Sequence, residues 1–214
     1  MAPTERETEA MVEPDQGAAA PSGSSSVRDD PVARSLRAAP REHFLRPGER
    51  AFAGDDAPLP IGANQTCSQP RTVVAMLRLL DVRPGHSVLD VGAGSGWTTA
   101  LLAHLVGPTG SVVGVELLPD LARWGAENLA ALRLPWASIR PAQAAVLGWP
   151  ATAPYDRVLV SAGAEQLPRP LVEQLRPDGV LVVPVSGQMM RVRLLPDGAL
   201  DVTEHGAYRF VPLK

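Results

Sequence analysis

The segment Val88-Leu-Asp-Val-Gly-Ala-Gly-Ser-Gly96 joins a short apolar run to three closely spaced glycines. β-Branched and apolar residues favour a buried strand, expected at residues 87–91, and glycines let the chain turn tightly and let a ligand approach the backbone. Residues 97–106 continue with a largely apolar stretch of helical length. The segment therefore predicts a strand, a glycine turn and a helix in direct succession.

The sequence on either side of this segment also alternates between strands and helices. Short apolar runs rich in valine predict further strands at residues 111–115, 155–161 and 179–185. Apolar stripes predict helices at residues 119–132 and 168–175 and a helix that begins at Pro70. Residues 189–195 and 200–202, separated by Pro196-Asp-Gly198, predict a terminal antiparallel hairpin. This order predicts an α/β fold with a Rossmann-like, doubly wound and mainly parallel sheet.

The length of 214 residues, 45% of them apolar, predicts one globular domain preceded by a tail. Residues 1–30 carry seven acidic and two basic residues among small polar ones, which predicts a disordered acidic tail. Residues 31–79 are predicted to form an N-terminal helical and loop segment, with a short helix that ends at Pro40 and a loop up to Gly62. We expect this segment to contact the substrate. Residues 80–214 form the expected cofactor-binding part.

Charge and cysteine content disfavour several kinds of partner. The net charge of −3, from 20 basic and 23 acidic residues without a basic cluster, disfavours nucleic acid. Cys67 is the only cysteine and the four histidines are dispersed, so we predict no metal site. The sequence contains no signal-peptide pattern and no apolar run of about 18 residues, so we predict no membrane contact and a cytoplasmic protein, which we expect to be a monomer.

The glycine turn falls where an open parallel sheet binds its ligands, at the carboxyl ends of the strands. Gly92 and Gly94 allow close backbone approach, and the N–H groups that open the next helix favour a carboxylate. Dinucleotide sites have the pattern G-x-G-x-x-G, whereas this turn has G-x-G-x-G preceded by Asp90. The turn therefore predicts S-adenosylmethionine (SAM), whose methionine carboxylate fits such a site, rather than NAD.

An acidic residue, Glu116, ends the second strand of this unit. A carboxylate at this position can accept hydrogen bonds from both ribose hydroxyls of a nucleoside. Asp90 has two interpretations, as a ligand of the amino-acid end of SAM or as a cap of the turn. The predicted cofactor contacts of this unit are Asp90, Gly92, Gly94, Ser95, Glu116 and Leu117.

Further segments, several of them outside the glycine turn, carry a resemblance to one family. They are Pro40-Arg-Glu-His-Phe44, Pro58-Leu-Pro-Ile-Gly62, Asn64-Gln-Thr-Cys-Ser-Gln-Pro70, Leu89-Asp-Val-Gly-Ala-Gly-Ser-Gly96, Gly148-Trp-Pro150, Ala153-Pro-Tyr-Asp156, Gln174-Leu-Arg-Pro-Asp-Gly-Val-Leu-Val-Val-Pro-Val185 and Arg209-Phe-Val-Pro-Leu213. With these segments, residues 31–214 resemble the protein-L-isoaspartate (D-aspartate) O-methyltransferases.

The resemblance implies methyl transfer from SAM to the free carboxylate of an isoaspartyl residue in a peptide or protein, giving an ester that collapses to a succinimide. The family's Gln-Thr-Ile-Ser-Gln-Pro loop lies over SAM and carries its active-site serine. This implies Ser68 as the catalytic residue here, with Gln65, Thr66 and Cys67 near the cofactor. Ser68 also has the alternative interpretation of a helix N-cap ahead of Pro70.

The chain departs from the family pattern at the position that the resemblance assigns to adenine. Gln143, Ala144 and Ala145 stand where the family has Gly-Asp-Gly, whose aspartate accepts a hydrogen bond from the adenine amine. Ala144 and Ala145 are still expected to border the cofactor. Loss of one such bond is expected to weaken SAM binding by about 1 to 2 kcal/mol unless Gln143 replaces it.

This departure leaves two alternatives to isoaspartyl methylation. One is a tailoring enzyme of a peptide natural-product pathway, which esterifies a particular aspartate so that it forms an aspartimide. The other is a homologue that has lost catalysis and acts as a binding partner, for which Ala144 is the sequence observation.

Overall fold

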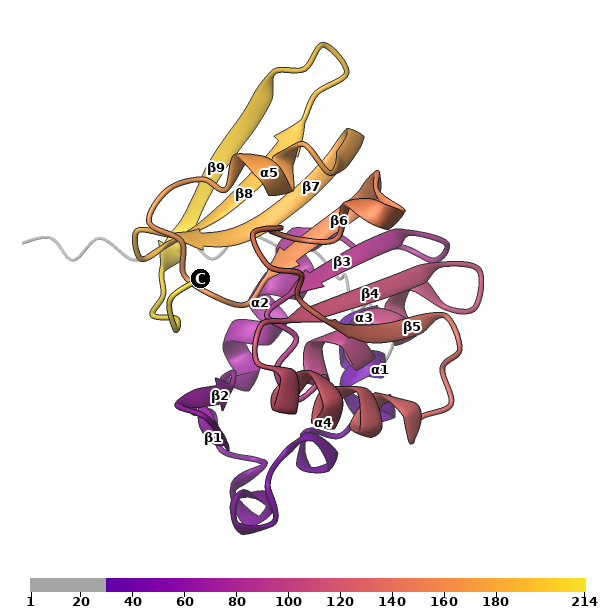
Figure 1. Cartoon of the computed structure of the whole chain (residues 1–214), viewed down its shortest axis with the longest axis vertical. Helices are drawn as coiled ribbons and strands as arrows, with labels where there is room; N and C mark the ends of the chain where they lie inside the picture. The colour runs from indigo at the N-terminus through magenta and orange to yellow at the C-terminus, as the bar shows by residue number, and fades with distance from the viewer. Residues whose placement is uncertain (1–29) are drawn as a thin grey trace, which may run out of the picture.

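A computed structural model describes residues 30–214 as a central sheet covered by helices (Figure 1). The acidic tail predicted over residues 1–30 lies outside the described residues, except for Asp30. That residue caps the first helix, α1 (Pro31–Ala38), by accepting a hydrogen bond from the Val32 amide at 3.0 Å. Asp30 also pairs with Arg78 at 2.9 Å, which joins the start of α1 to α2 (Pro70–Leu80).

Within residues 30–214, seven strands form the sheet, in the order β5-β4-β3-β6-β7-β8-β9. Their bounds are β3 Ser87–Val91, β4 Ser111–Glu116, β5 Ala137–Pro141, β6 Tyr155–Val160, β7 Leu175–Val185, β8 Gln188–Leu194 and β9 Leu200–Ala207. The neighbouring strands β5, β4, β3, β6 and β7 pair in parallel. Strands β8 and β9 continue the sheet in antiparallel pairs. The predicted fold class and the terminal hairpin are therefore confirmed. Because β3 lies between β4 and β6, the strand order reverses there, which places a binding crevice at the carboxyl ends of these strands.

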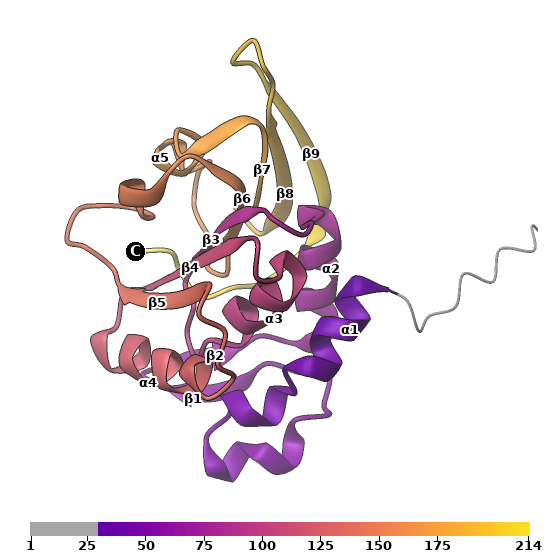
Figure 2. The same ribbon diagram turned by 90° about the vertical axis from the view of Figure 1, so that its right-hand side faces the viewer.

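Helices cover both faces of the sheet, as Figure 2 shows with α1, α3 and α4 below it and α5 above it. Alternate residues of each strand point to opposite faces, so Val88 packs with the helices below and Leu89 with α5. The remaining helical segments are α3 Trp97–Val106, α4 Pro119–Ala130, α5 Arg169–Val172 and the short 3-10 helices η1 Arg41–Phe44, η2 Pro47–Phe52 and η3 Pro150–Thr152.

The N-terminal segment shares its hydrophobic core with the sheet. Phe44 and Ile61 are buried in one cluster with Leu77 of α2 and Leu101 of α3. The boundary that the sequence places near residue 80 falls at the end of α2, within this continuous core. Packing therefore fixes the N-terminal segment directly against the cofactor-binding part.

Three parts of the fold differ from the sequence prediction. The helix predicted at 168–175 is wrong at its end, because Leu175 pairs with Tyr155 of β6 and already belongs to β7. Strand β5 was not predicted, because it is only five residues long, ends in Pro141 and has a weak apolar pattern. It forms by pairing with β4. The predicted loop up to Gly62 includes strand β1 (Leu59–Gly62), which pairs with β2 (Gln65–Cys67).

We predict that Gly125→Ala lowers the free energy of unfolding by about 2 kcal/mol, although alanine is the better helix former. A methyl group at Gly125 of α4 would lie 2.6 Å from the Gly94 carbonyl oxygen in the glycine turn. Urea unfolding measures the change. Gly48→Ala is the matched control, because a methyl group there meets no atom within 4 Å. Equal unfolding free energies for the Gly125 variant and the parent would contradict this packing.

Candidate active site

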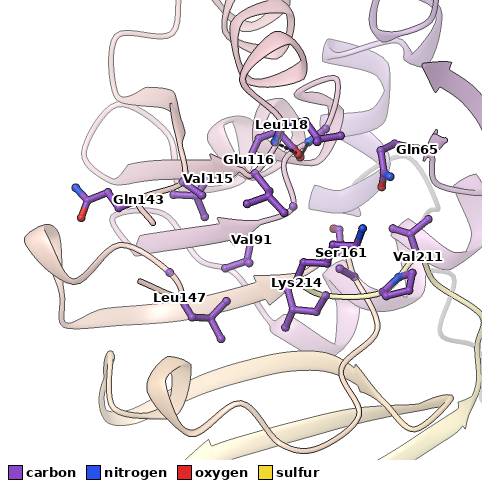
Figure 3. Close-up of a pocket in the computed structure, with 18 of the residues that line it drawn as sticks. Gln65, Val91, Val115, Glu116, Leu118, Gln143, Leu147, Ser161, Val211 and Lys214 are labelled. Atoms are coloured by element: carbon purple, nitrogen blue, oxygen red, sulfur yellow. Dashed lines mark hydrogen bonds between the residues drawn. The ribbon is translucent and has the colours of Figure 1, made fainter. Parts of the chain in front are cut away.

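A cavity of about 870 Å³ lies at the carboxyl ends of β3, β4 and β6 (Figure 3). Its wall is formed by the glycine turn, the end of β4, residues 142–148, the β1–β2 hairpin and residues 211–214. Figure 3 shows Gln65, Ser161 and Val211 on one side of the cavity and Gln143 and Leu147 on the other. The volume is in the range of a site for a small-molecule ligand of cofactor size.

A second cavity of about 30 Å³ adjoins the large one beneath the β2–α2 loop. Thr66, Gly92, Gly94 and Ser161 line both cavities, whereas Ser68 lines only the small one. The small cavity has about the volume that one water molecule occupies in liquid water. Ser68 therefore borders the small cavity, which lies next to the large one.

The turn after β3 depends on glycine at three positions. The φ angles of Gly92, Gly94 and Gly96 are +81°, +54° and +89°, in the region that side-chain-bearing residues avoid. The Gly94 amide donates a hydrogen bond to Glu116 Oε2 at 2.9 Å. The turn therefore presents backbone without side chains to the cavity.

Glu116 joins the glycine turn to the start of α4. Its Oε1 accepts a hydrogen bond from the Leu118 amide at 3.0 Å, in addition to the Gly94 bond on Oε2. The side chain is buried yet borders the cavity, as does Leu117. Each carboxylate oxygen has a second lone pair, so Glu116 can still accept hydrogen bonds from a diol in the cavity. The structure thus places Glu116, the predicted ribose contact, next to the glycine turn at the same cavity.

Asp90, one of the predicted cofactor contacts, lies beneath the turn, where it is fully buried and lines neither of these two cavities. Its Oδ2 accepts hydrogen bonds from the hydroxyls of Thr98 at 2.9 Å and Thr99 at 2.7 Å. Burial raises the pKa of Asp90 to about 6, against the opposing effect of the two threonine hydroxyls. The structure thus favours the second interpretation of Asp90, a residue that holds the turn and the first turn of α3.

Strand β2, the loop after it and the glycine turn bring the other predicted site residues to the two cavities. Gln65 and Thr66 line the large cavity, and Cys67, Ser68 and Ser95 line the small one. Burial raises the pKa of the Cys67 thiol, which is consistent with a buried apolar role. The interpretation of Ser68 as N-cap of α2 is wrong, because Gln69 occupies the cap position and makes no side-chain cap bond.

Ala144 and Ala145 line the far side of the large cavity and give it an apolar surface. Ala145 has a φ of +60°, a conformation that glycine adopts more easily. Figure 3 shows the Gln143 amide directed away from Glu116 and Val91. Gln143 nevertheless lines the cavity, so its replacement of the missing aspartate stays a prediction.

Sequence reasoning missed two parts of the cavity wall. Ser161 follows β6 at the strand reversal, and its hydroxyl is buried without a hydrogen-bond partner among residues 30–214. Its position at a strand end was the available signal. Residues 211–214 reach the cavity because Gly163 pairs with Val211 at 2.7 Å and with Leu213 at 2.8 Å, a contact with no local sequence signal.

Within residues 30–214, no group of three or more His, Cys, Asp or Glu side chains is arranged to hold a metal ion. In the same range, the helices are too short or too polar to cross a membrane.

A parallel sheet with a glycine turn and a carboxylate at neighbouring strand ends, both facing one cavity, defines the nucleoside-cofactor fold of class I methyltransferases. Within this class, a sequence model of the protein-L-isoaspartate(D-aspartate) O-methyltransferases matches residues 22–214. The chain belongs to this family.

Relatives and a solved structure agree with this assignment. A protein-L-isoaspartate O-methyltransferase from Methanopyrus kandleri is 42% identical over 191 residues, which cover 87% of this chain and 84% of the relative. One from Triticum aestivum is 39% identical over 197 residues, covering 87% and 85%. A crystal structure from Plasmodium falciparum, described as a methyltransferase of this kind in complex with S-adenosyl-L-homocysteine, has a TM-score of 0.77 at 25% identity and covers 88% of this chain and 92% of its own.

We predict that Asp90 makes the parent chain less stable, relative to Asp90→Asn, as the pH rises from about 4 to about 7. The folded state holds the Asp90 proton up to a pH of about 6, whereas the unfolded chain releases it near the ordinary carboxyl value. Stability from this group is therefore full at low pH and is lost as pH rises, by about 3 kcal/mol.

Urea unfolding of both chains without ligand at several pH values measures this difference. The Asn variant keeps an acceptor for Thr98 and Thr99 and cannot titrate. A difference that stays constant would mean that folding does not shift the pKa of Asp90, and one that grows in favour of the parent at higher pH would mean that the carboxylate is the stabilised form. Either result would contradict the prediction.

Proposed function

We propose that this chain transfers a methyl group from SAM to the carboxylate of isoaspartyl residues in peptides or proteins. The products are S-adenosylhomocysteine and a methyl ester, which collapses to a succinimide as the neighbouring backbone nitrogen displaces methanol. The observation that carries this proposal is the large cavity that runs from Glu116 to strand β2, with Ser68 at the small cavity beside it, in a chain of this family.

The residues of the cavity fit SAM at three points. Glu116 would accept hydrogen bonds from the ribose hydroxyls, since its oxygens keep free lone pairs. Gly92 and Gly94 would accommodate the methionine end against bare backbone, with the amides at the start of α3 near its carboxylate. Leu117 and Ala144 would contact the adenine ring with apolar surface.

The remaining predicted contacts would enclose the cofactor near its methyl group. Gln65 and Thr66 come from β2, Cys67 and Ser68 from the end of the hairpin and Ser95 from the turn, whereas Ala145 would border the adenine beside Ala144. These side chains would exclude water from the reaction, which strengthens electrostatic interactions and prevents hydrolysis.

The reaction requires little acid–base chemistry from the protein. A substrate carboxylate with a pKa near 4 is already ionised at neutral pH, so no general base is needed. SAM supplies a methyl group activated by its sulfonium. The protein's contribution is to align the carboxylate oxygen with the carbon–sulfur bond that breaks, a positioning effect. The Ser68 hydroxyl would hold the carboxylate by donating a hydrogen bond from beside the small cavity.

We predict that Ser68→Ala lowers kcat for methylation of an isoaspartyl peptide by about tenfold to a hundredfold, because the carboxylate loses its hydrogen-bond donor. The affinity for S-adenosylhomocysteine is expected to stay within about threefold of the parent value, since Ser68 does not line the large cavity. Steady-state kinetics and calorimetry measure these quantities. Ser111→Ala, an exposed serine at the opposite end of β4, is the control. An undiminished kcat in Ser68→Ala would remove the serine from the reaction.

We predict that Ala144→Asp combined with Ala145→Gly strengthens SAM binding by about tenfold. The aspartate restores an acceptor for the adenine amine, and glycine relieves the positive φ at position 145. Calorimetry with S-adenosylhomocysteine measures the change, with Ala145→Gly alone as the control that adds no acceptor. Equal affinities for the double variant and this control would mean that adenine does not lie against residue 144.

Methylation of paired peptides tests the proposed function. The chain is incubated with methyl-labelled SAM and either an isoaspartyl peptide or the same peptide with ordinary aspartate. Label on the isoaspartyl peptide alone agrees with the proposal. Absence of ester on that peptide, with SAM bound, would contradict it.

The peptide assay and calorimetry together test the two alternatives that the sequence left open. The relatives described above are named for isoaspartyl methylation, and they give no support to a tailoring enzyme of natural-product peptides. Ester on the aspartyl peptide alone would favour that tailoring role. Failure of S-adenosylhomocysteine to bind in calorimetry would favour a binding partner without catalysis.

A further inference from the structure

Arg41 in η1 is a buried arginine that contacts two separate loops. Its side chain is 5% exposed and donates hydrogen bonds only to backbone carbonyls. Nη1 donates to Ala53 at 3.4 Å and Asp55 at 3.0 Å, and Nη2 to Ala57 at 2.7 Å, Cys67 at 3.0 Å and Ser68 at 3.0 Å. One guanidinium thus joins residues 53–57 to the loop that carries Ser68.

Backbone carbonyls, rather than a paired carboxylate, accept the hydrogen bonds of the two Arg41 Nη atoms, and the buried Nε has no partner in the described part of the chain. Among residues 30–214, no Asp or Glu forms an ion pair with it. The guanidinium carbon lies 5.4 Å from the centroid of the Trp97 ring, at the start of α3 directly after the glycine turn. A buried charge is costly unless hydrogen bonds satisfy it, so Arg41 requires these carbonyls to stay in place.

A second arginine holds the opposite end of the same hairpin. Arg46 Nε donates to the Ile61 carbonyl at 3.0 Å, and its guanidinium lies 3.7 Å from the centroid of the Trp124 ring on α4. Arg46 therefore ties β1 to α4, whereas Arg41 ties the end of β2 to Trp97 and the start of α3. The hairpin is fixed at both ends against the elements that surround the glycine turn.

We infer that Arg41 is a positioning residue, which fixes the Cys67–Ser68 backbone and thereby directs the Ser68 hydroxyl toward the cavities. The inference rests on the proposed function for its effect on catalysis. Lysine cannot replace the planar guanidinium, because its ammonium has only three donors around one point. Arg41→Lys keeps the charge and loses the geometry that joins the two loops.

Cys67 provides a direct measure of the loop position. It is the only cysteine of the chain, it is 4% exposed, and its own carbonyl accepts a bond from Arg41. Burial also raises the pKa of its thiol, which slows its reaction with disulfide reagents. The rate at which dithionitrobenzoate labels Cys67 therefore reports how often this loop opens.

The experiment compares Arg41→Lys with the parent chain and with Arg191→Lys. Arg191 donates one hydrogen bond to the Leu79 carbonyl, away from the cavities, and is the matched control. For Arg41→Lys we expect Cys67 labelling to accelerate by about tenfold and kcat to fall by about tenfold, with the KM for SAM changed by less than about threefold. Arg191→Lys is expected to leave the three quantities at the parent values.

Parent rates of Cys67 labelling and of catalysis in folded Arg41→Lys would overturn the inference and leave Arg41 as a residue of stability only. Faster labelling with unchanged kcat would overturn the catalytic part. If Arg41→Lys does not fold, Arg41→Gln is measured by the same criteria, since its amide retains two donors. A parent chain that does not methylate an isoaspartyl peptide would contradict the proposed function, while the labelling rates would still test the loop contact.

Discussion

The Glu116 carboxylate accepts hydrogen bonds from the Gly94 amide at 2.9 Å and from the Leu118 amide at 3.0 Å. These bonds connect the end of β4 to the glycine turn and to the start of α4. Because the turn has bare backbone toward the cavity, it has few side chains that could hold its shape. From below, the buried Asp90 carboxylate binds the hydroxyls of Thr98 and Thr99. Two carboxylates thus fix one wall of the cavity.

The opposite wall depends on contacts between distant parts of the chain. The β1–β2 hairpin is held by Arg41 and Arg46, whose donors satisfy backbone carbonyls rather than carboxylates. Residues 211–214 close another side through backbone bonds to Gly163. The wall at the glycine turn is therefore built within one βαβ unit, while the opposite wall is assembled from both ends of the described chain.

This difference explains what the sequence could predict. The strand, turn and helix around residues 87–106 depend on local apolar patterns and on glycine, so their bounds and their place in the cavity were predicted well. Glu116 was found because it ends the next strand. The burial of Ser161 and the carbonyl contacts of Arg41 depend on tertiary packing, which leaves no periodic signal in the sequence. Arg41 and Ser68, for example, are 27 residues apart. Asp90 was predicted as a cofactor contact, with a cap of the turn as the alternative, and its burial beneath the turn is a tertiary feature that the sequence did not indicate.

The most direct test of this account is a crystal structure of the chain with S-adenosylhomocysteine and an isoaspartyl peptide. We expect the ribose hydroxyls to bind Glu116, the adenine to lie against Ala144, and the peptide carboxylate to lie between the sulfur and the Ser68 hydroxyl. A nucleoside bound away from Glu116, or a carboxylate held without contact to Ser68, would contradict it.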